Sequence, residues 1–160
     1  MSALSANRDS KRSVGDIVSM AGASGQHIYA GALTQINTSG YLVEATGVTA
    51  NRFAGVAWDE IDNSSTNKKL SSISNGGLYG RVYQKGVFTF AANGTPAQTD
   101  IGKMAYILDD QTVGVSVGCY VPAGRIVDFT SSTYRVAIDS AIGYPGCFFG
   151  SGASGSWIGA

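Results

Sequence analysis

The stretch RVYQKGVFTFAANGTPAQTDIGKMAYILDDQTV, residues 81–113, decides the fold. Its first ten residues alternate between two faces, with Val82, Phe88 and Phe90 on one of them. The opposite face carries the polar residues Arg81, Lys85 and Thr89. Asn93-Gly94 follows and is typical of a turn. Residues 81–90 are therefore predicted to form one half-buried strand.

The second half of this stretch predicts a short helical turn and another strand. Thr95-Pro96-Ala97-Gln98 has a hydroxyl to cap a helix, a proline for its first position and an amide to reach back. Gly102 is expected to end that turn. Residues 104–108 are apolar and predict a buried strand, and Asp109-Asp110 predicts the turn after it.

Outward from this centre, short apolar segments alternate with clusters of Gly, Asn, Asp and Ser. Thr38-Ser39-Gly40 predicts a hairpin turn, and residues 130–133 predict another. The further strands are expected at residues 14–20, 28–36, 41–45, 53–59, 113–117, 125–129 and 134–139, with a long polar loop at 61–77. No segment has the pattern of a helix of normal length. The even spacing of strands and turns predicts an all-β fold, a small barrel-like or sandwich domain.

The composition divides the chain into three zones. Residues 1–13 form a polar, extended N-terminal arm with the cations Arg8, Lys11 and Arg12, residues 14–139 form the β domain, and residues 140–160 form a Gly/Ser-rich C-terminal tail. The tail carries large aromatic residues, namely Phe148, Phe149 and Trp157. They either fold back and complete the core or dock on a neighbouring subunit, and the sequence leaves both open.

Composition argues against several function classes. The 160 residues carry no net charge and only 14% charged side chains, so charge gives no case for binding nucleic acid or an anionic membrane. The polar start lacks the apolar segment of a signal peptide, and no run is long enough to span a membrane. We therefore expect assembly in a cytosol. Cys119 and Cys147 are too few for a disulfide framework and are expected to be free thiols.

Reactive side chains do not form a recognisable catalytic pattern. His27 is the only histidine, and neither a triad nor a zinc site can be built around it. The acidic segments at residues 59–63 and 109–110 could hold calcium, but their spacing is not that of an EF-hand. Residues 150–155 match G-x-G-x-x-G without the strand and helix that a dinucleotide site needs. The sequence predicts no enzyme, no cofactor and no metal.

The ordered motifs of residues 4–139 resemble the capsid decoration, or cement, proteins of tailed phages and prophages. They are Leu4–Arg8, Ile28–Leu33 with Gly40-Tyr41, Gly55–Ala57 with Asp62-Asn63, Arg81–Ala91, Asp100–Val113, Pro122–Asp128 and Val136–Ile138. Each motif is only a strand with its turn, so the resemblance lies in their order and spacing. Residues 140–160 depart from the family pattern.

The resemblance implies a structural protein on the outside of a phage head, assembled in the host cytoplasm. It implies the major capsid protein as the partner, a homotrimer with a dimer as the alternative, and no catalytic residues. We expect the capsid contacts to include the arm cations and tail aromatics named above. The alternative function is a carbohydrate-binding or adhesive module of the phage surface, in which exposed aromatic rings stack on sugars. The rings proposed for this are Tyr29, Tyr41, Trp58 and Tyr79.

Overall fold

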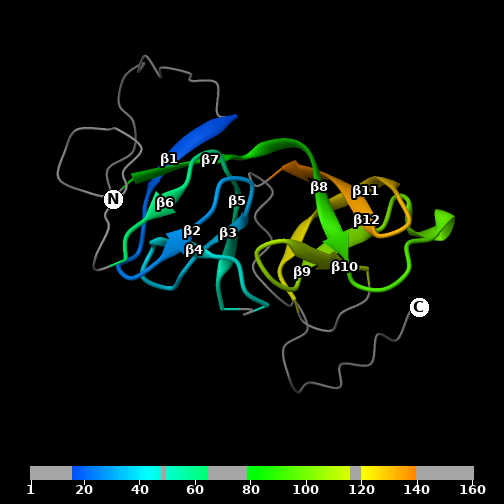
Figure 1. Ribbon diagram of the computed structural model, residues 1–160, viewed down its shortest axis with the longest axis horizontal. Coiled ribbons are helices and arrows are strands. Elements are labelled where there is room, and N and C mark those ends of the chain that lie inside the picture. The colour runs from blue at the N-terminus through cyan, green and yellow to red at the C-terminus, as the bar shows by residue number, and fades with distance from the viewer. Residues whose placement is uncertain (1–15, 48–49, 65–78, 116–119, 140–160) are drawn as a thin grey trace, which may run out of the picture.

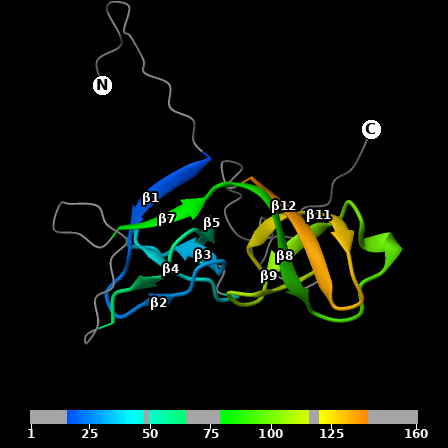
Figure 2. The same ribbon diagram turned by 45° about the horizontal axis from the view of Figure 1, so that its top comes forward.

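The computed structural model describes residues 16–47, 50–64, 79–115 and 120–139 (Figure 1). These residues form twelve short strands and one 3-10 turn, so the all-β prediction is confirmed. The strands gather into two lobes that lie side by side in both views (Figures 1 and 2). The predicted arm, the predicted tail and all six candidate capsid contacts in them lie outside the described residues.

The first lobe is a five-stranded sheet that curls until its edge strands meet. Its strand order is β1-β7-β5-β3-β4, and a parallel bridge between Gly22 and Leu42 joins the end of β1 to β4. We call this sheet the first barrel, because that single bridge brings its two edges together. Its strands are β1 (Ile17–Ala21), β3 (Leu33–Ile36), β4 (Leu42–Glu44), β5 (Arg52–Ala57) and β7 (Tyr79–Tyr83). The short strands β2 (His27–Ile28) and β6 (Ile61–Asp62) pair with each other beside it.

The second lobe is a closed five-stranded barrel with the order β10-β8-β12-β11-β9. Its strands are β8 (Lys85–Ala92), β9 (Met104–Ile107), β10 (Thr112–Gly114), β11 (Pro122–Phe129) and β12 (Thr133–Asp139). Both predicted hairpins are present, β3–β4 through residues 37–41 and β11–β12 through residues 130–133. Of the two predicted architectures, the described residues form barrels.

The predicted strand at residues 81–90 is in fact two strands, and this correction explains the architecture. β7 completes the first barrel and β8 begins the second, with Gln84 alone between them. Gly86 has a φ of 145°, a value that side chains disfavour, so the chain changes direction here. The predicted alternation still holds within each half, since Val82 and Phe90 are buried and Thr89 is exposed. Val82 and Phe90, however, enter different cores.

Two apolar clusters fill the molecule. The first barrel encloses the smaller cluster, whose buried members include Ile28, Leu42 and Val82. The larger cluster fills the second barrel and also takes in Leu33, Phe53 and Val56 from the outer face of the first barrel. The two lobes therefore bury apolar surface against each other through the larger cluster.

Strand order and direction are the same in the two barrels. In the first barrel, β1 lies between β4, which is parallel to it, and β7, which is antiparallel. In the second barrel, β8 lies in the same way between β10, which is parallel, and β12, which is antiparallel. β5 lies between β3 and β7 in the first barrel, and β11 lies between β9 and β12 in the second; each is antiparallel to both of its neighbours. The chain is thus a tandem repeat of one five-stranded unit, which the sequence analysis did not detect.

Backbone hydrogen bonds recur at matching places in the two units. The amide of Gly31 donates to the carbonyl of Ala57 at 2.8 Å, and that of Gly102 donates to Ile126 at 2.8 Å. Both glycines have positive φ, 87° and 86°. The reverse bonds, from the amide of Ala57 to Ala32 and from the amide of Ile126 to Lys103, are 2.8 and 2.9 Å long. These pairs align the two units residue by residue.

A glycine in the fourth strand of each unit meets the fifth strand in the same way. A methyl group on Gly55 would lie 2.0 Å from the carbonyl oxygen of Tyr83, and one on Gly124 would lie 2.1 Å from that of Ala137. Both glycines also follow a break in register with the second strand. The two units therefore share a close backbone approach that only glycine permits.

Four local predictions need correction. The predicted strand 28–36 is divided by a turn, because the amide of Ala32 bonds to the carbonyl of Tyr29. The predicted loop 61–77 begins with strand β6, whose residues are buried. Residues 104–108 alternate between exposed and buried instead of being buried throughout. The 3-10 turn, Gln98–Asp100, starts after Ala97, whose amide is bonded by the Asp100 carboxylate, so Thr95 is not its cap.

A matched pair of substitutions in β8 tests which face is buried. Phe90→Asp should unfold the protein, because it removes roughly 1.5–3 kcal/mol of burial and leaves a carboxylate in the core. That loss is large against a total stability of about 5–15 kcal/mol. Thr89→Asp should fold normally, because Thr89 is exposed and pairs with Arg135 across the ladder. Circular dichroism and urea unfolding measure both; equal stability of the two variants would contradict the assigned faces.

Candidate functional site

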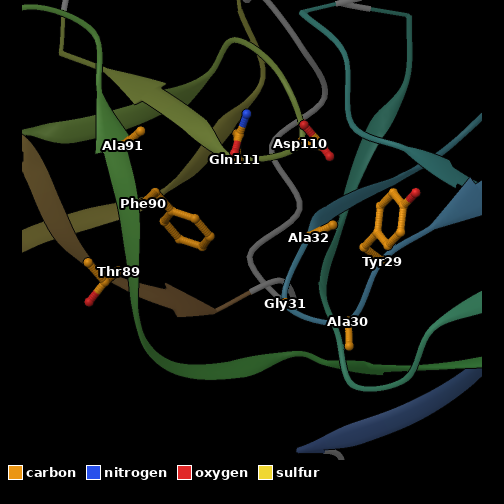
Figure 3. A pocket seen from close by; sticks show the side chains of 9 residues that line it. All are labelled: Tyr29, Ala30, Gly31, Ala32, Thr89, Phe90, Ala91, Asp110 and Gln111. Atoms are coloured by element: carbon orange, nitrogen blue, oxygen red, sulfur yellow. The ribbon is translucent and has the colours of Figure 1, made fainter.

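A groove of about 450 Å³ lies at the junction of the two barrels (Figure 3). The turn after β2 forms one wall, with Tyr29 projecting from it, and β8 with the β9–β10 turn forms the other. Phe90 points toward the groove, and its ring is 4% exposed. The polar groups on the rim are the side chains of Asp110 and Gln111. The groove is shallow, and polar and apolar atoms line it about equally.

The backbone of this groove ties the barrels together. The amide of Leu33 in the first barrel donates to the carbonyl of Asp110 in the second at 2.7 Å. The neighbouring Asp109 carboxylate accepts hydrogen bonds from the amides of Gln111 and Thr112, at 2.9 and 2.7 Å. This confirms the predicted turn, and it gives Asp109 a structural role within the turn.

The acidic segment 59–63 is divided among separate partners. Asp59 accepts two hydrogen bonds from Arg81, at 2.6 and 2.8 Å. Glu60 lies 2.9 Å from Nε2 of His27, and Asp62 accepts a hydrogen bond from the amide of Ser64. The carboxylates of Asp59, Glu60 and Asp62 therefore bind different groups of the fold. The described residues contain no group of three or more His, Cys, Asp or Glu arranged to hold a metal ion.

His27 enters a strand, as the sequence predicts. It lies in β2 opposite Asp62, and its ring centroid is 4.4 Å from that of Tyr29. Its Nε2 contacts the Glu60 carboxylate, and both side chains are more than a third exposed. This pair lies at the surface beside the β2–β6 pairing.

The most strongly perturbed ionisable groups belong to the second barrel. Asp100 is 6% exposed, and its carboxylate accepts hydrogen bonds from the Tyr134 hydroxyl at 2.7 Å, Lys103 at 3.0 Å and the Ala97 amide at 2.9 Å. Those bonds, that of Tyr134 above all, hold the pKa of Asp100 below its ordinary value. Burial, together with the hydrogen bond to Asp100, raises the pKa of Tyr134 to about 12. The network anchors the 3-10 turn to the barrel.

The four aromatic residues proposed for sugar stacking are all exposed. Tyr29 is 60% exposed and Tyr41 48%, while Trp58 and Tyr79 are close to 39% and 38%. Trp58 is already in contact with protein, because its ring stacks on Tyr83 at 4.7 Å and the Arg81 guanidinium lies 5.3 Å from its centroid. Part of the Trp58 ring is therefore already covered by the protein.

Several predicted features cannot be placed. Arg8, Lys11, Arg12, Phe148, Phe149 and Trp157 lie outside the described residues, as do Cys119, Cys147 and the glycine-rich segment 150–155. In the part of the chain that the structure describes, no helix has the length and apolar character needed to cross a membrane. The junction groove and the Asp100–Tyr134 network were not predicted, because both join residues far apart in sequence.

The Tyr134 hydroxyl makes a testable contribution to alkaline stability. Its folded pKa of about 12 lies above its ordinary value of 10.0, so the fold favours the neutral phenol. This stability is fully present below pH 10 and is lost as the pH rises through about 12. Tyr134→Phe should therefore melt at a lower temperature at pH 8 and lose less stability between pH 10 and pH 12 than the wild type.

Thermal melts followed by circular dichroism provide the measurement. Tyr41→Phe is the control, because Tyr41 is exposed and its replacement should leave the alkaline slope unchanged. An identical alkaline slope for wild type and Tyr134→Phe would show that the buried phenol does not set this part of the pH dependence.

Comparisons with known proteins add no relative: no protein-family model, no curated protein and no solved structure matches this chain.

Proposed function

We propose that this protein is a structural, non-enzymatic protein that decorates the outside of a tailed-phage head and bridges neighbouring major capsid subunits. The observation that carries the proposal is the ordered set of family-like motifs over residues 4–139. Within the described residues these motifs form strands and turns of a tightly packed two-barrel body. Such a body offers rigid surface for protein contacts, and its mechanism would be many weak contacts repeated over a shell.

The charges and contacts of the described residues favour this function over chemistry. Asp59, Glu60 and Asp62 each engage a nearby group of the fold, and Asp109 caps its own turn. The perturbed pair Asp100 and Tyr134 is buried and bonded to itself instead of facing the junction groove. These groups are used for stability, as expected of a scaffold.

Binding to heads that lack the protein tests the proposal directly. The purified protein should co-sediment with such heads, saturate at a fixed ratio to the major capsid protein, and raise the temperature at which the heads release DNA. Deleting residues 1–13 should weaken binding strongly while leaving the fold intact, because this segment is polar and has no apolar periodicity. Single charge reversals at Arg8, Lys11 or Arg12 should cost only about 0.2–1 kcal/mol each.

Circular dichroism of the truncated protein provides the folding control. Full-strength binding by the folded truncation would remove the arm from the mechanism and direct attention to Phe148, Phe149 and Trp157. A wild-type protein that never binds assembled heads would refute the proposed function.

The second candidate function is a carbohydrate-binding or adhesive module. The observation that favours it is the exposure of Tyr29, Tyr41 and Tyr79. Because aromatic rings stack on sugar faces, Tyr29→Ala or Tyr41→Ala should then abolish binding on a glycan array. Glycan binding by the wild type without binding to heads would favour this second function.

A further inference from the structure

One row of residues crosses the outer face of the first barrel, and its members in β7, β5 and β3 meet the second barrel. Ile17 pairs with Tyr83, Tyr83 with Val56, and Val56 with Leu33, so the row crosses β1, β7, β5 and β3. We call it the docking row. Leu33 and Val56 are 0% and 1% exposed because they pack into the larger core, and Tyr83 contacts Phe88 at 5.3 Å.

The repeat places an equivalent row on the second barrel. Val87 pairs with Ala137, Ala137 with Arg125, and Arg125 with Met104, across β8, β12, β11 and β9. We call it the outer row. Val87 is 49% exposed and Met104 36%, and Arg125 is exposed as well. The outer row is therefore the docking row of the second unit, with no described residue covering it.

The surface that receives the docking row also recurs. In the second barrel it includes Phe88, Phe90, Ile107 and Val115, which all pack in the larger core. The Gly22–Leu42 bridge matches the Ala92–Val113 pairing. With Gly22 matched to Ala92 and Leu42 to Val113, Phe88, Phe90 and Val115 are equivalent to Val18, Met20 and Glu44 of the first barrel. The match of Gly31 with Gly102 makes Ile107 equivalent to Ile36. We call these four the receiving side.

The receiving side is less covered than its counterpart. Met20 and Ile36 are half-buried, whereas their counterparts Phe90 and Ile107 are 4% and 0% exposed. Glu44 is exposed and its counterpart Val115 is half-buried, while Val18 and its counterpart Phe88 are both half-buried. The contact between the barrels is head-to-tail, since it joins different surfaces of two equivalent units. A head-to-tail contact leaves one surface of each kind unused at the two ends of the pair.

We propose that a second copy of this chain occupies the outer row, inserting it into the receiving side of its own first barrel. The contact between molecules would repeat the one already made between the two barrels of each molecule. Because such a contact joins unlike surfaces, it builds either a closed ring or an open chain of copies. The inference rests on the internal repeat and does not depend on the proposed function.

The charges of the two surfaces are complementary. Arg125 in the outer row takes the place of Val56 in the docking row, and Glu44 on the receiving side takes the place of Val115. Both charged residues are exposed, and neither side chain has an ion-pair partner among the described residues. The contact within one molecule is apolar at these positions, whereas the contact between copies would pair Arg125 with Glu44. Complementary charge at such a site selects the partner.

A charge-swap experiment tests the proposal on the full chain. Sedimentation velocity over a wide range of protein concentration should show reversible association of the wild type. Arg125→Glu alone and Glu44→Arg alone should each weaken association by about tenfold or more. The double variant Arg125→Glu with Glu44→Arg should recover most of it, because the pair is restored with opposite polarity.

Arg135→Glu is the matched control. Arg135→Glu changes the net charge as much as Arg125→Glu does. The equivalent of Arg135 in the first barrel, Arg81, is 42% exposed and pairs with Asp59, and Arg135 itself pairs at the surface with Asp128. Position 135 therefore lies outside the expected contact, and the variant should associate like the wild type. Circular dichroism of every variant confirms folding.

Cysteine labelling at position 104 separates a second copy from a segment of the same chain. In a Met104→Cys variant that also carries Cys119→Ser and Cys147→Ser, position 104 is the single thiol, and its protection from a maleimide reagent should rise with protein concentration if another copy covers the outer row. Protection that is independent of concentration would assign the cover to the chain's own residues and overturn the proposal. A strictly monomeric wild type, or two single variants without effect, would also overturn it.

Discussion

The structure depends on the burial of the docking row against the second barrel. Five-stranded barrels of this size enclose few side chains, and small units gain little stability from their own interiors. Sharing Leu33, Phe53 and Val56 with the second barrel enlarges the core that both can use. The Tyr83–Phe88 contact and the Leu33–Asp110 hydrogen bond lie at the same junction. Without this contact the outer face of the first barrel would expose a continuous apolar row to water.

The strand content was predictable because local patterns encode it. The alternation around Phe88 to Phe90, the turn at residues 37–41 and the Thr130–Thr133 connection depend on neighbours in sequence, and the structure contains all three. Strand ends were less predictable. Gln84 and Gly86 do not break the alternation of residues 81–90, so the boundary between the two barrels leaves little trace in the hydrophobic pattern.

The internal repeat was hidden for a related reason. Equivalent positions are occupied by residues of different chemistry, such as Val56 and Arg125 or Leu33 and Met104, because one unit is covered and the other is not. The glycines remain, since Gly55 and Gly124 meet a backbone that admits no side chain. The Ala-Gly dipeptides at 54–55 and 123–124 were therefore the available signal. Among the candidate functional features, the exposed tyrosines and the turn at Asp109 were predictable, while the junction groove required the tertiary fold.

The direct passage from β7 into β8 has a mechanical consequence. Only Gln84 separates Tyr83 from Lys85, so the connection has no slack. A pulling force applied to one barrel would pass along this nearly continuous strand into the ladders β1–β7 and β8–β12, which would both bear it as shear. Shear along a ladder loads many hydrogen bonds together instead of opening them one after another. The repeat is thus arranged as two load-bearing elements in series, with little capacity to hinge between them.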